Sequence, residues 1–336
     1  MKETAVFLNE REQNELARAY GSETRESLRR SLDLPEQVIL PETMDENRDL
    51  LARTSYVFST WGMPALTEEQ IADYLPNLKA VFYAAGSVQG FARPFLHRGV
   101  KVFSAWAANA VPVAEFTVAQ IVLAGKGYFQ GMRRFEPGSM KRFRAFSDTF
   151  PCNYGVRIGI LGAGMIGSLV LEMLRRYDVE TLVYDPFASE EKIAALGARR
   201  ASLEEIFSQC QVISNHIANL PATQRMLRYE HFSRMKPNGV FINTGRGAQV
   251  VEEDLVRALR EEPDRTALLD VTWPEPPEAD SPLWTMPNVI LSPHIAGSMN
   301  NEIARMGAYM QREYEALAEG RPCSWEVTLK RLETMA

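Results

Sequence analysis

Short apolar runs alternate with amphipathic stretches along the first part of the chain. The runs have the length of strands, and the stretches between them repeat apolar positions at helical spacing. One stretch opens with Thr67-Glu68-Glu69-Gln70, a capping box that predicts the start of a helix. The predicted strands are Thr4–Leu8, Gln37–Leu40, Tyr56–Ser59, Lys79–Tyr83 and Val100–Phe103. Such alternation predicts a parallel sheet covered by helices.

The alternation resumes after residue 155 and continues through most of the remaining chain. Ser202-Leu203-Glu204-Glu205 predicts a second capped helix, and the pattern from Gly297 to about Gly320 predicts one long helix. The predicted strands of this half are 156–161, 180–184, 212–214, 240–243, 266–269 and 288–291. Both halves therefore predict an α/β fold, and no internal repeat of fixed period relates them.

The middle of the chain differs from both halves. Helical spacing extends from Pro112 to about Phe129, and nearly all faces of this segment are apolar, which predicts burial between domains or between subunits. Residues 131–153 predict an irregular connector with room for one short helix. Its basic cluster fits a solvated surface and consists of Arg133, Arg134, Lys141, Arg142 and Arg144.

Length and composition favour an ordinary globular protein with two domains. At 336 residues the chain exceeds what a single core usually supports. A net charge of −6 gives no electrostatic reason to expect nucleic acid as a partner. No uninterrupted apolar run reaches the roughly 18 residues of a membrane span, and no signal-peptide pattern is evident. Three well-separated cysteines favour reduced thiols in a cytoplasmic protein over disulfides or a metal site.

The clearest chemical motif is Gly162-Ala163-Gly164-Met165-Ile166-Gly167, between the apolar strand 156–161 and a predicted helix. The first glycine permits a tight turn, the second a close approach of backbone to a pyrophosphate, and the third tight packing of helix on strand. The helix N-terminus then offers N–H groups and a positive dipole end to phosphate. A glycine turn without a nucleotide is the structural alternative.

Asp185 supports the nucleotide interpretation. It follows the strand 180–184, and 185 − 167 places it 18 residues past the last glycine. This spacing suits a carboxylate that accepts hydrogen bonds from the adenosine ribose. Because a 2′-phosphate would meet a like charge there, the sequence favours NAD over NADP.

Three later segments each place a polar group just past an apolar strand. Arg246 lies between two glycines, where a guanidinium can meet a carboxylate or carbonyl oxygen, although a lone arginine in such a loop more often lies on the surface. Glu275 lies in a proline-stiffened turn, which is also compatible with a simple loop carboxylate. His294 is balanced between a structural and a catalytic histidine. His216, at the end of the strand 212–214, either faces the cofactor or is satisfied structurally.

Together these groups predict one kind of chemistry. Histidine exchanges a proton near neutral pH, and a nearby glutamate orients the imidazole and favours its protonated form. An arginine polarises the oxygen that is reduced or oxidised. Arginine, glutamate, histidine and a dinucleotide site at the strand ends of one sheet predict hydride transfer at a carbonyl or alcohol carbon.

The combination resembles the D-isomer-specific 2-hydroxyacid dehydrogenase family. The resemblance rests on the glycine loop with Asp185, on Asn243-Thr244-Gly245-Arg246-Gly247, on Asp270 followed by Glu275, and on Ser292-Pro293-His294. Residues 109–117 are similar to the segment that begins the family's inter-domain helix, and residues 79–88 resemble its carboxylate-binding strand and loop. The resemblance therefore extends over most of the chain.

The resemblance implies two Rossmann-like, flavodoxin-like domains with parallel sheets and a cleft between them, the cofactor domain being inserted into the substrate domain. Residues 1–104 and 299–336 would form the substrate-binding domain, and residues 105–298 the NAD-binding domain. Family members are commonly dimers through their cofactor domains, so a homodimer is expected.

Roles follow from the same resemblance. Arg246 would bind the substrate carboxylate and 2-oxo oxygen, and His294, paired with Glu275, would be the acid in reduction and the base in oxidation. Asp270 would contact the nicotinamide carboxamide side. The residues expected to bind NAD are Gly162, Gly164, Met165, Ile166, Gly167, Asp185, His216, Thr244, Gly245, Arg246, Asp270, His294 and Gly297. Those expected to bind substrate are Trp61, Ala85, Gly86, Ser87, Arg246 and His294.

Two departures from the family pattern concern specificity. The carboxylate loop reads Ala85-Gly86-Ser87 where the family more often has glycine on both sides of a small residue, so the shape of the pocket differs. The lead-in to the glycine loop, residues 153–157, also differs, with no evident consequence for the chemistry. Trp61 either lines the substrate side, favouring a larger or apolar substituent, or belongs to the core.

Other functions of the same fold remain open at this point. A nucleotide-sensing protein like the carboxyl-terminal-binding co-repressors would keep the same catalytic groups, although no long disordered tail or partner-docking signature is evident. Formate dehydrogenases share this fold but resemble a type of site with a Gln–His pair, so Glu275 speaks against formate oxidation. The sequence is also compatible with a phosphoglycerate dehydrogenase, although we expect no further regulatory domain after the last helix.

Overall fold

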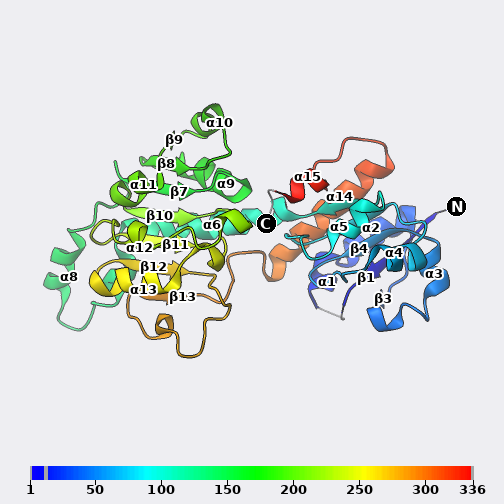
Figure 1. The fold of residues 1–336 in the computed structure, drawn as a ribbon, viewed down its shortest axis with the longest axis horizontal. Coiled ribbons are helices and arrows are strands. Elements are labelled where there is room, and N and C mark those ends of the chain that lie inside the picture. The colour runs from blue at the N-terminus through cyan, green and yellow to red at the C-terminus, as the bar shows by residue number, and fades with distance from the viewer. Residues whose placement is uncertain (1, 11–13, 334–336) are drawn as a thin grey trace. The chain divides into compact units, whose positions relative to one another are not determined.

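The computed structural model describes residues 2–10 and 14–333 and divides the chain into two compact units (Figure 1). Unit 1 consists of residues 1–109 and 298–336, and unit 2 of residues 110–297. The expected boundaries followed residues 104 and 298, whereas the observed ones follow residues 109 and 297. Both units are α/β, as predicted, and each is built on a sheet that is parallel or almost entirely parallel.

The sheet of unit 1 has the strand order β14-β6-β5-β4-β1-β2, with β3 also paired to β1. Its strands are β1 (Glu3–Leu8), β2 (Leu32–Asp33), β3 (Val38–Ile39), β4 (Thr54–Ser59), β5 (Ala80–Tyr83), β6 (Lys101–Ser104) and β14 (Glu326–Val327). All five predicted strands are confirmed. The sequence did not predict β2 and β14, each two residues long, because neither lies in a longer apolar run. Only β14 pairs antiparallel among the described strands.

Side chains of this sheet alternate between two cores, one on each face. Val6, Val57 and Val81 face a core closed by α3 to α5, while Phe7, Phe58 and Phe82 face a core closed by α1, α2 and α14. The helices are α1 (Asn14–Ala19), α2 (Ser22–Ser31), α3 (Arg48–Ala52), α4 (Glu68–Tyr74), α5 (Ala92–His97), α14 (Ile303–Ala318) and α15 (Leu329–Leu332). The capping box of α4 is confirmed, since Thr67 and Gln70 each accept the other's backbone N–H.

The C-terminal helix begins later than predicted. Residues 297–299 are not helical, and a short 3-10 turn, Asn300–Glu302, precedes α14. Asn300 has a left-handed backbone (φ 47°), and the Glu302 carboxylate accepts the N–H of Met299. These local contacts replace the first helical turn. The other 3-10 helices are η1 (Pro41–Thr43), η2 (Pro221–Thr223), η3 (Gly247–Gln249) and η4 (Pro282–Trp284).

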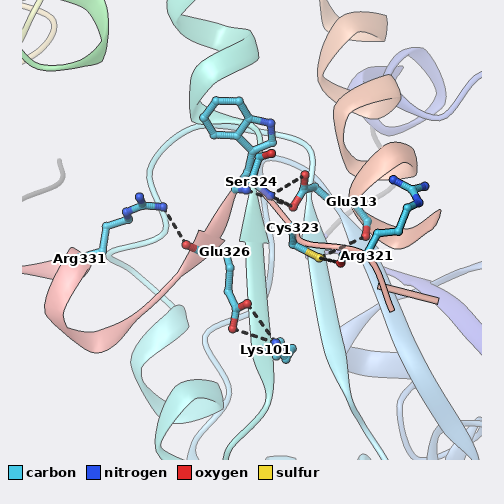
Figure 2. A network of polar contacts seen from close by, with 8 residues as sticks. Lys101, Glu313, Arg321, Cys323, Ser324, Glu326 and Arg331 are labelled. Carbon is cyan, nitrogen blue, oxygen red and sulfur yellow. Dashed lines mark hydrogen bonds and ion pairs between the residues drawn. The ribbon is translucent and has the colours of Figure 1, made fainter. Parts of the chain in front are cut away.

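A buried carboxylate attaches the C-terminal strand to unit 1 (Figure 2). Glu313 of α14 is 5% exposed, and its oxygens accept the backbone N–H groups of Ser324 and Trp325 at 3.0 to 3.2 Å. One residue further on, Glu326 of β14 forms an ion pair with Lys101 of β6 at 3.0 Å. The segment that leads into β14 is therefore held by charge-assisted hydrogen bonds to a helix.

The sheet of unit 2 is parallel throughout, in the order β13-β12-β11-β10-β7-β8-β9. Its strands are β7 (Arg157–Leu161), β8 (Glu180–Tyr184), β9 (Arg199–Arg200), β10 (Val212–Asn215), β11 (Val240–Asn243), β12 (Thr266–Leu269) and β13 (Val289–Leu291). Six were predicted, and β9 was not. The chain leaves β7 toward β8 and returns on the other side with β10. The switch point between β7 and β10 is where open α/β sheets bind ligands.

Helices cover both faces of this sheet. Ile158, Ile160 and Val212 face a core shared with α6 (Trp106–Gly125), α9 and α10, while Leu161, Ile213 and Phe241 face a core shared with α11 to α13. These helices are α9 (Met165–Leu174), α10 (Glu190–Ala195), α11 (Leu203–Gln209), α12 (Tyr229–Phe232) and α13 (Glu252–Glu261). Ser202 caps α11 as predicted, because its side chain accepts the N–H of Glu205.

The long apolar helix is displaced from its predicted bounds. Helix α6 runs Trp106–Gly125 with Pro112 inside it, so the proline does not mark the helix start. Gly127, with φ +66°, then begins a turn into α7 (Tyr128–Met132). By length and composition alone, α6 is the one helix of the described residues that could cross a membrane, yet 56% of that window is buried inside the protein.

The connector between the halves is partly pinned by its arginines. Arg133 donates to the carbonyl of Pro287 and to Thr266 Oγ1, and Arg134 pairs with Asp264. Both arginines are exposed, as the predicted solvated basic surface requires, and they also connect this segment to residues beside β12. The rest of the connector includes α8 (Met140–Ser147), whose basic residues are exposed.

Candidate active site

The predicted cofactor and catalytic residues of unit 2 gather at the carboxyl ends of its strands. The glycine loop follows β7, and His216 follows β10. The loop with Arg246 follows β11, Asp270 follows β12 and His294 follows β13. In a parallel sheet these ends share one edge, so the fold brings the motifs together.

The glycines of the loop satisfy separate geometric demands. Gly162 has φ +92°, a backbone conformation that L side chains rarely adopt. A Cβ on Gly167 would lie 1.9 Å from the carbonyl oxygen of Gly162, so only glycine lets α9 pack this closely. Nothing lies within 4 Å of a Cβ built on Gly164, which leaves that side of the loop open. The first N–H groups of α9, at Met165 and Ile166, have no acceptor within the helix.

Asp185 contacts the glycine loop directly. Its Oδ2 accepts the N–H of Ala163 at 2.7 Å, and its Oδ1 accepts the N–H groups of Phe187 at 2.8 Å and Ala188 at 2.9 Å. The carboxylate is thus fixed at the edge of the loop while it remains partly exposed. Its geometry fits an acceptor for ribose hydroxyls, because each carboxylate oxygen has two lone pairs.

His216 is buried beside the same loop. Its backbone carbonyl would lie 2.8 Å from a Cβ on Gly162, and its Nε2 lies 2.9 Å from Ser214 Oγ. Burial lowers the pKa of His216 to about 3, so the imidazole is neutral at physiological pH. Its Nδ1 has no hydrogen-bond partner among the described residues. The side chain therefore holds one unused polar atom next to the switch point.

Three buried carboxamides hold the loops after β10 and β11. Asn215 donates to Asn243 Oδ1 at 3.1 Å and to Gln249 Oε1 at 3.3 Å. Asn243 in turn accepts the N–H of Gly245 and donates to the carbonyl of Arg246. Gln249 donates to the carbonyl of Ile217, and Asn215 accepts the N–H of Ile217. The backbone on both sides of Arg246 and next to His216 is thereby fixed.

Other packing contacts confine the same loop. The hydroxyls of Thr117 in α6 and Thr244 share a buried hydrogen bond of 3.0 Å. A Cβ on Gly247 would lie 2.0 Å from the carbonyl carbon of Thr272, so any larger residue would displace the loop. Burial lowers the pKa of Arg246, and the nearby charge of Glu275 opposes that effect. Arg246 is therefore a half-buried cation whose side chain donates to the carbonyl of Gly245.

Glu275 and His294 form a direct pair. The distance between Glu275 Oε1 and His294 Nδ1 is 2.6 Å, and both side chains are partly exposed, at 39% and 48%. With Nδ1 facing the carboxylate, Nε2 is the nitrogen left to exchange a proton. His294 also has a left-handed backbone, with φ 54°, which is uncommon for a residue with a side chain.

Asp270 explains how this backbone conformation is held. Its Oδ1 accepts Ser292 Oγ at 2.5 Å and the N–H of Ile295 at 2.9 Å, while its Oδ2 accepts the N–H of Ala296 at 2.9 Å. Its carbonyl accepts the N–H of His294. The 3% exposed carboxylate thus binds the segment that carries His294 from both sides. Gly297 ends this segment and is half-buried.

The substrate residues predicted in unit 1 lie at the carboxyl ends of β4 and β5. Trp61 is half-buried and packs against both cores of the unit. Ser104 Oγ donates to the carbonyls of Ala85 and Gly86, at 2.9 and 2.6 Å. The N–H groups of Gly86 and Ser87 meet no acceptor in the described part of the chain. These free donors fit an anion such as a carboxylate.

The geometry of unit 2 fits a bound dinucleotide. The open side of Gly164, the free N–H groups of α9 and the fixed carboxylate of Asp185 suit pyrophosphate and ribose. Within residues 2–10 and 14–333, no group of three or more His, Cys, Asp and Glu side chains is placed to hold a metal ion. Fold and site together define a dinucleotide-binding α/β protein with a carboxylate–imidazole pair.

Comparison with known proteins identifies the family. The profile of the D-isomer-specific 2-hydroxyacid dehydrogenase NAD-binding domain matches residues 120–296, more than half of the chain. The chain belongs to the D-isomer-specific 2-hydroxyacid dehydrogenase family. It is 26% identical over 267 residues to a D-3-phosphoglycerate dehydrogenase of Archaeoglobus fulgidus, an alignment that covers 79% of this chain and 50% of that protein. The chain spans about half the length of the phosphoglycerate dehydrogenases it matches.

Solved structures of low identity share the fold. A phosphoglycerate oxidoreductase of Rhizobium etli has a TM-score of 0.78 at 24% identity, covering 96% of this chain and 97% of that one. The apo D-mandelate dehydrogenase of Rhodotorula graminis has a TM-score of 0.77 at 18% identity, covering 97% and 98%. At such identities the likeness establishes the fold alone.

Some residues of the site escaped sequence reasoning. Asn215, Gln249 and Thr117 were not predicted because a buried polar residue leaves no periodic signal, and their partners are distant in the chain. Lys192 and Arg200, which contact the backbone around Asp185, were also missed. Only their positions after the acidic residue of a glycine-loop motif hinted at them.

Proposed function

We propose that the protein is an NAD-dependent oxidoreductase that interconverts a D-2-hydroxy acid and its 2-oxo acid. The observation that carries this proposal is the pairing of Glu275 with His294 at 2.6 Å, at the same sheet edge as the glycine loop. Family membership supports the reaction class. Unit 2 would hold NAD, and unit 1 would bind the substrate.

In the proposed mechanism, proton transfer is assigned to His294. Glu275 holds Nδ1–H, so Nε2 carries the proton that is delivered to the carbonyl oxygen during reduction and removed from the hydroxyl during oxidation. The left-handed backbone held by Asp270 keeps this imidazole at the sheet edge.

The oxygens of the substrate are assigned to Arg246 and to the backbone donors of residues 85–87. Arg246 would bind the carboxylate and the 2-oxo oxygen, because a guanidinium fork suits two oxygens at once. The N–H groups of Gly86 and Ser87 would hold the carboxylate, together with the neighbouring Ala85. Trp61 lies at the carboxyl end of β4 and would border the substituent at C2 of the acid.

The residues that would hold NAD lie around the glycine loop. When bound, the nicotinamide supplies or accepts the hydride at the carbon that bears the oxygen. Gly162, Gly164, Met165, Ile166 and Gly167 would receive the pyrophosphate on backbone N–H groups. Asp185 would accept from the ribose, and His216, Thr244, Gly245, Asp270 and Gly297 would border the cofactor.

The assignment of Arg246 provides the direct test. We expect Arg246→Ala to lower kcat/KM for the best 2-oxo acid by about 10²–10³ if the guanidinium stabilises developing charge. Arg246→Lys, which keeps the charge but loses the fork, should recover only part of the loss. The substrate for this test comes from a screen of NADH and NADPH oxidation with glyoxylate, hydroxypyruvate, pyruvate, phenylpyruvate and branched 2-oxo acids. Near-normal turnover by Arg246→Ala would overturn the assignment.

A nucleotide-sensing binding protein is the second candidate function, since such proteins of this fold would keep the same groups. Stoichiometric NADH binding without turnover of any acid in the screen would favour the sensor instead.

We also propose a homodimer in a reducing, cytoplasmic setting. The three cysteines are free thiols, and Cys210 is buried. Several large apolar side chains of the segment from Leu123 to Met140 are exposed in unit 2, which favours a partner for that surface.

A further inference from the structure

Two cations lie against the turn that carries Asp185. The Lys192 ammonium donates to the carbonyl of Ala163 at 2.7 Å, and the N–H of the same Ala163 donates to Asp185 Oδ2. The Arg200 guanidinium donates to the carbonyl of Asp185 at 2.6 Å and to that of Ala188. Each cation therefore touches the backbone of a residue that takes part in holding the carboxylate.

The positive charges of these residues are only weakly compensated. Lys192 forms no ion pair with a carboxylate of residues 2–10 or 14–333, and its hydrogen bond goes to a neutral carbonyl. Arg200 has one carboxylate nearby, Glu190, at 3.7 Å, and that side chain is 81% exposed. Because ionised acceptors form stronger bonds to cations than carbonyls do, a phosphate placed at this turn would recruit both side chains.

We propose that Lys192 and Arg200 form a 2′-phosphate subsite beside Asp185, so that preference for NADH over NADPH depends on the single negative charge of Asp185. The inference rests on the proposed function, which places the adenosine ribose at Asp185. A 2′-phosphate is repelled by this carboxylate and attracted by the two cations at the same turn. Removal of the negative charge leaves the attraction unopposed.

A purely structural role of the two cations makes a different forecast. If Lys192 and Arg200 only support the turn, their loss weakens the binding of NADH and of NADPH equally. If they bind the 2′-phosphate, their loss weakens the binding of NADPH selectively. The ratio of the two dissociation constants separates these cases, because any general damage to the glycine loop affects both cofactors and cancels in the ratio.

The experiment measures Kd of the full chain for NADH and NADPH by fluorescence titration without substrate. We expect Asp185→Asn to lower the ratio Kd(NADPH)/Kd(NADH) by about 30-fold, since the like-charge repulsion of the 2′-phosphate is removed. Adding Lys192→Gln and Arg200→Gln to Asp185→Asn should raise the ratio again by about tenfold or more. Because Arg200 also supports the turn, Lys192→Gln alone in the same background gives an independent measurement, with about a threefold rise expected.

Arg199 provides the matched control. It is the neighbour of Arg200 on β9, yet it pairs with Glu205 at 2.7 Å, and its side-chain hydrogen bonds go to Glu205 and to the carbonyl of Arg200 rather than to the Asp185 turn. Arg199→Gln should leave the ratio unchanged. If the ratio does not change when Lys192 and Arg200 are replaced, the subsite is overturned while the proposed function stands. The same conclusion follows if Arg199→Gln changes the ratio as much. A wild-type chain that binds neither dinucleotide overturns both.

Discussion

At the scale of single residues, the site is defined by groups that hold other groups in place. His294 has a backbone conformation that is unfavourable for a residue with a side chain, and the Asp270 carboxylate binds the two residues that follow it. Asp185 plays a comparable part for the glycine loop through Ala163. Both acids were predicted as cofactor contacts, and both have backbone partners that only the structure reveals.

Asp270 can therefore be tested for two roles at once. In Asp270→Asn the amide nitrogen would face an N–H of Ile295 or Ala296, so the His294 loop would shift. We expect kcat to fall by about 10²-fold, while Kd for NADH stays within about threefold. Steady-state kinetics and fluorescence titration supply the two numbers. Ser292→Ala, which removes one of the three side-chain bonds, should cost less. A loss confined to NADH affinity would instead support contact with the carboxamide.

His216 predicts how stability depends on pH. Its folded-state pKa of about 3 lies below the ordinary 6.5, so between these values only the unfolded chain binds the proton. Stability from this group is complete above pH 6.5 and is lost as the pH falls toward 3. We expect the free energy of unfolding to drop between pH 7 and pH 5 by about 2 kcal/mol more in wild type than in His216→Leu. Urea denaturation at both values measures this difference. Equal losses in the two proteins would show that His216 is protonated when folded.

At the scale of elements, predictability follows from burial. Parallel strands covered on both faces appear in the sequence as plain apolar runs, which is why eleven strands were predicted, among them β7 and β10. The strands β2, β9 and β14 each contain a charged residue and lie in no apolar run, whereas β3, equally short, lies in the run 38–40. The start of α6 at Trp106 was missed because Trp106-Ala107-Ala108 has no capping signal. The sequence predicts Pro112 as the start instead, since proline is common in the first turn of a helix.

The same limit applies to the site. Arg246, Glu275 and His294 were found because charged groups after apolar strands are conspicuous, and the fold brings strand ends together. The carboxamides Asn215 and Gln249 are 34 residues apart, and nothing local distinguishes them from exposed polar residues. Their burial depends on tertiary packing, which composition and spacing do not encode.

Glu313 tests how strongly the segment before β14 is attached to α14. Glu313→Gln would place an amide N–H₂ against the N–H groups of Ser324 and Trp325, leaving a buried donor without an acceptor. We expect a loss of about 1–3 kcal/mol in the free energy of unfolding. Glu326 is partly exposed, and Glu326→Gln, which breaks only the ion pair with Lys101, should cost less than about 1 kcal/mol. Chemical denaturation of both variants tests the order, and equal losses would contradict it.

At the scale of the whole molecule, the exposed apolar side chains of unit 2 require an explanation. Tyr128, Met132, Phe135 and Met140 are each about half exposed, and they follow one another closely along the chain. Monomers rarely leave such groups together in water. Arg133 and Arg134 lie between Met132 and Phe135, and they connect this segment to Thr266 and Asp264. This arrangement suits a second copy of the chain.

The proposed homodimer can be tested at this surface. We expect the wild-type chain to sediment at twice 37.9 kDa, and Met132→Lys combined with Phe135→Asp to sediment as a monomer, because two charges would be buried in an apolar contact. Leu329→Asp, an equally simple change at a residue 40% exposed in unit 1, should leave the dimer intact. Analytical ultracentrifugation at micromolar concentration measures all three proteins. A monomeric wild type, or a double variant that remains dimeric, would assign the apolar surface to another partner.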